Sequence, residues 1–437
     1  MSARPRGARA REVVLNPSSH NQAQSSVAPV RMVSGHPSPN SSAGEGISSI
    51  HLGSAVRVPL SLVPEGRGPL QDQVHEILSS QQRILKNQGL PMTVSSQTVF
   101  LREPADLKEC ERILSQYYGP KRPATNFVLQ PPCCGAALAL EAWAIGGHDV
   151  RVEYCGPHTV TVSYDGMRWI YCAGMRSSKA NDGVYGQTTG VLEQMGTALA
   201  RAGSGFEHVV RTWFYLGRIT EEDRDIQRYK ELNRARTDFY RGIEFHCSTL
   251  QPNIPQGLYP ASTGIGMLGA SLVGGCVALE TRREDALLLP LENPQQTPAY
   301  AYPPHHSPQS PKFSRGVVLV LDNYLTTWVY GTASVVHSNS RHPGNIEKQT
   351  EQTIENIEKL ISPENLSFHG IKHPGARLTD VAKYRVYLKR PEDFARCKAI
   401  CETRFGSVPA IYAIADVCRP ELLVEIEGVA FSKRNID

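Results

Sequence analysis

The chain has 437 residues, a formal net charge of +4 at pH 7 and 40% hydrophobic residues. A charge this close to balance does not favour binding to nucleic acid or to an acidic membrane surface. No apolar stretch reaches the roughly 18 residues that a transmembrane helix needs, and the N-terminus lacks the apolar core of a secretory signal. We therefore expect a globular, cytoplasmic protein.

The cysteines and the glycine-rich stretches give no sign of a metal or a nucleotide cofactor. The 10 cysteines include no CxxC pair and no Cys/His spacing typical of zinc. The sequence has no Walker A loop, no HExxH and no GxGxxG that opens a helix. We expect unpaired thiols, no metal site and no cofactor.

Residues 1–90 are rich in Ser, Pro, Gly, Asn and Gln. Such a composition buries too little apolar surface to offset the entropy lost on ordering. The prediction for 1–90 is a largely disordered extension, with a helix over 70–87.

Two later stretches repeat one order of strands and helices. Each reads strand, helix, strand, helix, strand, which predicts mixed α/β sheets with helices packed on one face. The first copy spans 168–175, 188–203, 206–217, 229–240 and 271–280, and the second spans 326–336, 345–361, 378–389, 392–405 and 422–431.

The repeat predicts two folded domains after the extension. Residues 91–290 would form an N-terminal domain with extra strands. Residues 291–437 would form a Pro-rich connector and a C-terminal catalytic domain.

The last strand carries an unusual pair of acids. Alternation puts Leu422, Val424 and Ile426 on one face, and Leu423, Glu425 and Glu427 on the other. Carboxylates within an apolar strand are costly unless they are paired or functional. The matching positions of the first copy are Gly274 and Cys276, so only the second copy carries the acids. The alternatives are a solvated sheet face or a structural ion pair.

The repeat unit resembles the RidA family of small trimeric imine deaminases. The resemblance implies a tandem RidA-like (chorismate-mutase-like) fold and suggests a homotrimer. In that family an Arg that binds the substrate carboxylate follows a Pro-Ala pair before the last strand. Here Ile411 follows Pro409-Ala410 and Ser262 follows Pro260-Ala261. These departures argue against imine deamination, which stays an alternative, as does a binding module without catalysis.

Residues 91–437 also resemble the chorismatases, which are built from RidA-like halves. The stretches that carry this resemblance are PATNFVLQPPCCGAALALEAWAIGG (123–147), ELNRARTDFY (231–240), YPASTGIG (259–266), ENPQQTPAYAYP (292–303), SPKFSRG (310–316), GTASVV (331–336) and VCRPELLVEIEG (417–428). The resemblance implies a cofactor-independent enzyme that releases pyruvate from chorismate.

The chorismatase resemblance assigns a role to each matched position. It implies that Glu425 is the catalytic general acid. It also implies that the substrate, a dicarboxylate, is bound by Arg236, Tyr302, Arg315, Thr332, Ala333 and Ser334. Arginine suits carboxylates because its planar fork makes two parallel charge-assisted hydrogen bonds.

Two further positions indicate which product forms. In the family, Gly at position 331 and Cys at position 418 accompany 3-hydroxybenzoate, whereas Ala and Val favour hydrolysis to 3,4-dihydroxycyclohexa-1,5-dienoate. Gly331 and Cys418 therefore favour 3-hydroxybenzoate, and hydrolysis is the alternative product route.

Overall fold

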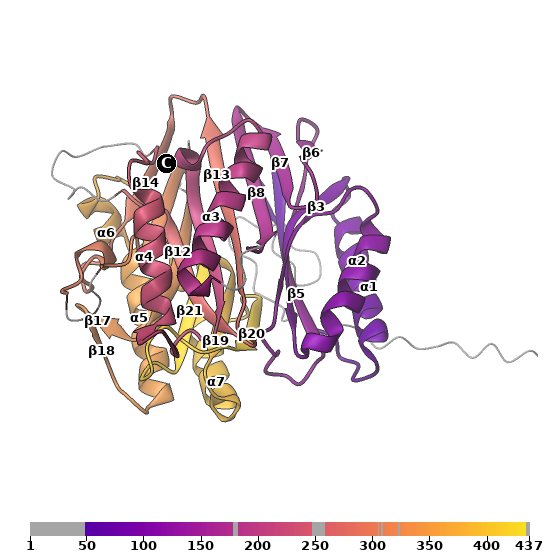
Figure 1. Ribbon diagram of the computed structural model, residues 1–437. Coiled ribbons are helices and arrows are strands. Elements are labelled where there is room, and N and C mark those ends of the chain that lie inside the picture. Colours follow the sequence, from indigo (N-terminus) through magenta and orange to yellow (C-terminus); the bar gives the residue numbers. More distant parts are fainter. Residues whose placement is uncertain are drawn as a thin grey trace, which may run out of the picture.

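The computed structural model describes residues 49–177, 182–246, 258–304, 306, 309–321 and 324–433. Its strands form three large sheets, one of five strands and two of six. Each sheet belongs to one segment of the chain, so the described residues form three consecutive α/β units (Figure 1). The sequence had predicted two.

The elements of the first unit are β1 (Ile50–Leu52), β2 (Ala55–Leu62), α1 (Leu70–Lys86), β3 (Met92–Leu101), α2 (Leu107–Tyr118), β4 (Ala124–Val128) and β5 (Leu138–Gly146). Those of the second are β6 (Arg151–Tyr154), β7 (Thr159–Tyr164), β8 (Met167–Met175), α3 (Gly183–Arg201), β9 (Val209–Gly217), α4 (Arg228–Tyr240), β12 (Ala261–Met267) and β13 (Leu272–Thr281). A short hairpin, β10 (Glu222–Asp223) and β11 (Ile226–Gln227), precedes α4.

The elements of the third unit are β14 (Ala286–Leu291), β15 (Gly316–Leu321), β16 (Tyr324–Ala333), α5 (Ile346–Ile361), α6 (Pro363–Phe368), β19 (Val381–Leu388), α7 (Phe394–Phe405), β20 (Ala410–Ile414) and β21 (Val424–Lys433). A second short hairpin, β17 (Val335–Val336) and β18 (Asn339–Ser340), follows β16. The predicted repeat elements and the predicted helix at 70–87 begin and end within three residues of these bounds. The exception is α3, which begins five residues earlier than predicted.

The three units share one sheet topology. The strand orders β2-β5-β3-β4, β8-β13-β9-β12 and β16-β21-β19-β20 are equivalent, and in each the last two strands pair in parallel. A Pro-Ala pair precedes or opens the edge strand of each unit, as Pro123-Ala124, Pro260-Ala261 and Pro409-Ala410. The first of these pairs is the signal by which the first unit could have been recognised.

The predicted disorder of 1–90 is wrong for residues 49–69, where β1 and β2 are formed, whereas the predicted helix over 70–87 is confirmed as α1; residues 1–48 lie outside the described part. The apolar residues of α1 recur at helical spacing, and Val74, Ile77, Leu78 and Ile84 are all buried. They pack with β2, β3 and β5 in one core cluster. The polar composition of the whole segment had hidden the two strands but not this helical pattern.

The helices cover the outer face of each sheet, and the inner faces meet one another. In Figure 1, α1 and α2 flank the first sheet on its outer side, at the right. A separate apolar cluster joins the three inner faces through residues such as Ala55, Trp169 and Trp328. The predicted homotrimer rested on the trimers of RidA-like units. In the described residues three α/β units surround one centre, and the homotrimer stays a prediction.

Strand pairing corrects the alignment of the repeats by one residue. Glu425 pairs with Tyr387, and the equivalent Tyr215 pairs with Val273. Glu427 pairs with Arg385, and by the same comparison the residue of the second unit that is equivalent to Glu427 is Gly275. The matches proposed from sequence, Gly274 and Cys276, are therefore wrong, because the adjacent glycines Gly274 and Gly275 carry no side chain that marks a face of the strand.

In the first unit the same register gives Ala139 opposite Phe100 and Glu141 opposite Thr98. Glu425 is thus equivalent to Ala139 and Val273, whereas Glu427 is equivalent to Glu141 and Gly275. The acid at position 425 occurs once among the three units. The acid at position 427 occurs twice.

A buried cluster of charges joins the three units at their centre. Glu427 of the third unit accepts hydrogen bonds from Arg211 of the second unit and, at 2.8 Å, from Arg385 of its own unit. Arg385 also bonds Glu141 of the first unit, as does Lys383. All five side chains are less than 10% exposed. We call these five residues the central ion cluster.

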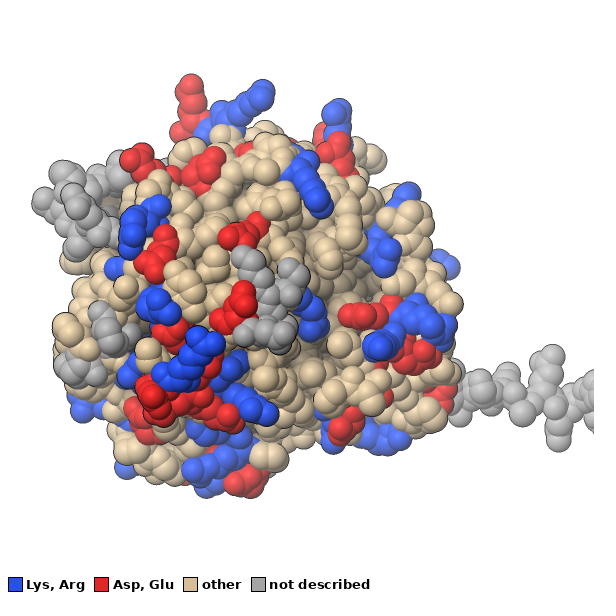
Figure 2. Space-filling view, viewed as in Figure 1, with Lys and Arg blue, Asp and Glu red and all other residues tan. Residues whose placement is uncertain are grey.

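Charges are interspersed on the surface that Figure 2 shows, where Lys and Arg lie beside Asp and Glu. Such an arrangement agrees with the small net charge. Among the described residues, no helix is both long and apolar enough to cross a membrane.

The substitution Arg385→Met tests the central ion cluster. It leaves two buried carboxylates with fewer counter-charges, so we expect a loss of about 3 to 5 kcal/mol in the free energy of unfolding. Urea unfolding followed by circular dichroism measures the change. The control Arg404→Met removes half-exposed pairs with Glu351 and Glu358 and should cost less than about 1 kcal/mol. Equal, small effects of the two substitutions would contradict a structural role for the cluster.

Candidate active site

A cavity lies between the second and third units. Its empty space, the mouth included, is about 740 Å³. α4 and β12 form one wall, and β16, β21 and the connector before β15 form the other. The residues that line it are Gln227, Tyr229, Lys230, Asn233, Ser262, Gly264, Tyr302, His306, Pro311, Phe313, Arg315, Tyr330, Gly331, Ala333, Val335, Cys418, Arg419, Leu422 and Glu425. The predicted C-terminal catalytic domain is therefore incomplete without the second unit.

Glu425 lies near the start of β21, and its side chain lines this cavity. Only 3% of the residue is exposed. Burial raises the pKa of its carboxyl to about 8, and the negative charge of Glu427 adds to the rise, while Arg211 opposes it. The carboxyl group is therefore mostly protonated at neutral pH, which is the state that a general acid needs.

Glu427, two residues further along the same face, has the opposite character. Burial disfavours its charge, but Arg385 and Arg211 outweigh burial and lower its pKa. It also accepts hydrogen bonds from the Trp213 indole at 3.0 Å and the Tyr387 hydroxyl at 2.8 Å. The structural ion pair considered from sequence is thus correct for Glu427, and it does not apply to Glu425.

The alternation predicted for this strand holds only from Val424 onward. Val424 and Ile426 pack under the helices of the third unit, as expected. Leu423 packs there too, whereas Leu422 lines the cavity beside Glu425. The chain turns just before β21 begins, so the period of two does not extend back to these leucines.

Arg315 lies at the connector side of the cavity and is 2% exposed. Its guanidinium donates to the hydroxyls of Tyr330 at 2.5 Å and Tyr302 at 2.6 Å, and to the carbonyl of Thr297 at 2.8 Å. These three neutral acceptors orient the positive charge without cancelling it. The predicted pair Tyr302 and Arg315 is therefore in direct contact.

The nearest carboxyl group to Arg315 is that of Glu292, at 4.0 Å from Nε. Burial raises the pKa of Glu292 to about 8, and Arg315 only partly opposes this rise. Glu292 is therefore largely uncharged at neutral pH, and Arg315 keeps its charge available for an anionic ligand.

Arg236 lies directly behind the cavity wall and is 1% exposed. It donates to Ser262 Oγ at 3.1 Å and to Asn233 Oδ1 at 2.6 Å, and both of these residues line the cavity. Its guanidinium packs over the Phe313 ring at 5.5 Å. No carboxylate forms an ion pair with Arg236 in the described part of the chain. Arg236 thus supplies a second uncancelled positive charge to the same site.

Gly331 allows Glu425 to occupy its position. A Cβ atom at residue 331 would lie 2.0 Å from Glu425 Oε1 and 3.0 Å from Thr263 Cγ2. The pairing of β16 with β21 shifts register between Val329 and Thr332, which brings both Tyr330 and Gly331 to the cavity. The bulge and the missing side chain together make room for the carboxyl group.

Cys418 also lines the cavity. Burial raises the pKa of its thiol to about 12, and the nearby Glu425 adds to the rise. The thiol is therefore protonated at neutral pH. It offers a small, polarisable wall rather than a nucleophile.

Of the three residues after Gly331, only Ala333 lines the cavity, opposite Glu425 in the strand pairing. The Thr332 hydroxyl donates to the Tyr330 carbonyl at 3.1 Å, and the Ser334 hydroxyl donates to the Arg341 carbonyl at 3.1 Å. The expectation that Thr332 and Ser334 contact substrate is therefore corrected. Alternate residues of a strand point to opposite faces, so these two point away from the cavity.

Sequence reasoning missed several residues of the site. Tyr229 and Asn233 lie one turn apart on α4, on the same side as Arg236. The spacing of four and then three residues places all three on one helix face, and this signal was present in the sequence. Glu292 was also missed as a residue of the site, because the sequence analysis named it only within the stretch ENPQQTPAYAYP (292–303). No group of three or more potential metal ligands occurs among the residues that the structure describes.

Comparison with known proteins gives consistent matches. A family profile described as chorismatase FkbO/Hyg5-like, N-terminal, matches residues 141–278. A 3-hydroxybenzoate synthase of Streptomyces hygroscopicus is 31% identical over 300 residues, which cover 66% of this chain and 80% of the relative. A chorismatase of Streptomyces rapamycinicus is 31% identical over 61% of this chain and 78% of its own length.

A crystal structure of a chorismatase superimposes on 77% of this chain and 93% of its own, with a TM-score of 0.59 and 21% identity. This likeness confirms the predicted α/β fold, and the sequence relatives confirm the predicted resemblance. The chain belongs to the chorismatase family.

Proposed function

We propose that this protein converts chorismate to 3-hydroxybenzoate and pyruvate, with Glu425 as the general acid. The observation that carries the proposal is a buried carboxyl group with a raised pKa in a cavity that Arg315 lines, with Arg236 bonded to two further lining residues, Ser262 and Asn233. The names of the relatives, 3-hydroxybenzoate synthase and chorismatase, support the same substrate and products.

The substrate carries two carboxylates and an enol ether. One carboxylate would lie near Arg315 and Tyr302, and the other near Arg236 and its partners Ser262 and Asn233. Because these groups are fixed by hydrogen bonds and buried, little reorganisation accompanies binding. The ring would lie against the small residues Gly331 and Ala333.

Glu425 would transfer its proton to the enol methylene carbon, which turns the three-carbon side chain into a leaving group. The ring C–O bond then breaks, and the ether oxygen departs as the keto oxygen of pyruvate. The oxygen kept in 3-hydroxybenzoate must come from the neighbouring ring hydroxyl, which attacks the carbon that pyruvate leaves. The O–H proton of that hydroxyl returns to Glu425, and the original C–O bond of the same oxygen then breaks. The hydrogen on the carbon that now bears the oxygen leaves as a proton, which the oxygen takes up, and the ring becomes aromatic. Chorismate thus divides into the two products without water, oxidant or reductant.

The alternative product route is hydrolysis, in which water enters and the dihydroxycyclohexadienoate forms. Gly331 and Cys418 favour the formation of 3-hydroxybenzoate, because these two small residues would let the ring lie close to Glu425. We also propose a cytoplasmic setting, since the nine described cysteines are all unpaired, as in a reducing compartment.

The substitution Glu425→Gln tests the catalytic acid. We expect purified protein to release pyruvate from chorismate, and the variant to lose about 100-fold or more in kcat, because the amide cannot donate the proton. A lactate dehydrogenase-coupled assay measures the pyruvate. The control Glu421→Gln alters an exposed carboxylate that bonds only Ser340 and should keep its activity. Full activity in Glu425→Gln would refute the proposed role.

The pH dependence follows from the raised pKa of Glu425. The acid form predominates below about pH 8 and falls as pH rises through that value. We therefore expect kcat to be level near neutrality and to fall by about tenfold per pH unit above pH 8. Steady-state rates at saturating chorismate give the profile. A rate that stays constant or increases up to about pH 10 would be inconsistent with an acid of this pKa.

The paired substitution Gly331→Ala, Cys418→Val tests the product route. The added methyl at 331 meets Glu425 Oε1, so the carboxyl group must move and the ring must shift with it. We expect the share of diene diol to increase at the expense of 3-hydroxybenzoate. Mass spectrometry of the products measures the ratio. Unchanged products would show that these two positions do not select the route.

A further inference from the structure

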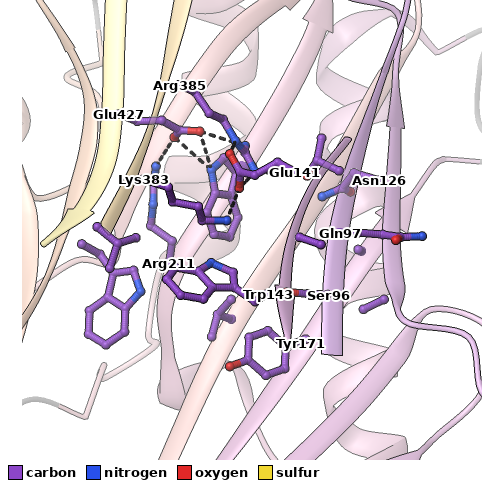
Figure 3. Close-up of a pocket in the computed structure, with 18 of the residues that line it drawn as sticks. Ser96, Gln97, Asn126, Glu141, Trp143, Tyr171, Arg211, Lys383, Arg385 and Glu427 are labelled. Carbon is purple, nitrogen blue, oxygen red and sulfur yellow. Dashed lines mark hydrogen bonds and ion pairs between the residues drawn. The ribbon is translucent and has the colours of Figure 1, made fainter. Parts of the chain in front are cut away.

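A second cavity lies at the centre of the molecule, apart from the Glu425 cavity. Its empty space, the mouth included, is about 890 Å³, and its walls come from the inner faces of all three sheets. Figure 3 shows the charged side chains of the central ion cluster at one end and Trp143 and Tyr171 at the other. Nothing in the proposed reaction uses this space.

The walls of the central cavity are unusually aromatic. The chain contains four tryptophans, and all four line this cavity. They are Trp143, Trp169, Trp213 and Trp328, and Tyr171 joins them. Flat aromatic walls favour a planar ligand that can stack on them.

The charge in the cavity is not balanced. Four cationic residues line it, namely Arg57, Arg211, Lys383 and Arg385, against the two carboxylates Glu141 and Glu427. Four minus two leaves an excess of two positive charges. Three of the four cations belong to the central ion cluster, where the carboxylates engage them.

Arg57 is the fourth cation, and it is not part of the cluster. It is 6% exposed, and its guanidinium lies 5.0 Å from the Trp169 ring centre and 5.8 Å from that of Trp143. The acceptor of its hydrogen bond is the neutral hydroxyl of Tyr171. Within the described ranges, no carboxylate forms an ion pair with Arg57. A buried guanidinium held between two indole rings without a counter-charge is costly unless an anion joins it.

We infer that the central cavity binds a planar aromatic monocarboxylate of the benzoate class. Its carboxylate would pair with Arg57, and its ring would lie among the tryptophans. Ser96 and Asn126 on the first unit's wall offer polar groups to a ring substituent, whereas the amide of Gln97 bonds Thr125 and Tyr118 instead. An inorganic anion would leave the aromatic walls unused, and a neutral ring would leave Arg57 without a counter-charge. The inference does not rest on the proposed catalytic activity.

Benzoate is the probe, added to the full-length protein while tryptophan fluorescence is recorded. Because all four tryptophans line the cavity, we expect a saturable change with a midpoint of about 1 mM or below. The variant Arg57→Gln should weaken binding by about tenfold or more, since a charge-assisted pair is lost. Isothermal titration calorimetry gives an independent value.

Matched controls separate this site from the Glu425 cavity. The variant Arg315→Gln should keep the fluorescence change, because Arg315 lines only the other cavity. Cyclohexanecarboxylate, which keeps the charge but not the flat ring, should bind more weakly than benzoate, as should neutral phenol. Arg57→Gln should retain its chorismate turnover if that activity exists, which would show that the variant is folded.

A fluorescence change that disappears in Arg315→Gln would overturn the inference, because benzoate would then occupy the other cavity. The absence of saturation in the unaltered protein would overturn it as well, as would equal affinity in Arg57→Gln. Should Arg57→Gln not fold, Arg57→Lys replaces it. Lysine keeps the charge but loses the planar fork, so weaker benzoate binding is expected and unchanged binding would contradict the inference.

Discussion

The buried carboxylate of Glu427 is the constraint on which much of the structure depends. It remains charged only because Arg211 and Arg385 reach it from two different units. Arg385 extends the contact to Glu141 of the first unit. The positions of β9, β19 and β21 are therefore fixed relative to one another, and the location of Glu425 follows from them. Burial keeps the proton on Glu425, and the same negative charge adds to this effect.

Two carboxyl groups two residues apart thus have different tasks because their surroundings differ. Glu427 has cations and donors around it and is ionised. Glu425 has an apolar strand, the Gly331 backbone and its charged neighbour, and it keeps a proton. A similar contrast holds around Arg315, whose nearest acid, Glu292, is uncharged at neutral pH. The site combines a proton donor with positive charges that are not neutralised, which is the combination that an enol ether dianion requires.

The sequence allowed the repeat elements of the second and third units, the helix over 70–87 and six of the residues that line the Glu425 cavity to be predicted. Strand and helix periodicity located the elements, and the family resemblance located Arg236, Tyr302, Arg315, Gly331 and Cys418. The first unit was missed because the polar composition of 1–90 was averaged over a segment whose second half folds. The Pro123-Ala124 pair would have indicated the first unit if it had been compared with Pro260-Ala261 and Pro409-Ala410.

Other errors came from contacts that a single strand does not reveal. Thr332 and Ser334 point away from the cavity because they alternate with Gly331 and Ala333, a separation that the family resemblance does not reveal. The repeat alignment was one residue out because Gly274 and Gly275 carry no side chain to mark a face. The role of Glu427 depends on partners more than 40 residues away in sequence, and it became clear only with the fold.

The joining of three similar units in one polypeptide has an evolutionary consequence. In an assembly of identical subunits, each substitution appears at every interface, so a change that helps one cleft alters all of them. Here a substitution affects a single cleft. Ala139 and Val273 fill the positions that Glu425 occupies in the third unit, so a linked chain can carry the acid in one unit and apolar residues in the other two. Covalent linkage thereby allowed specialisation without loss of the ancestral packing.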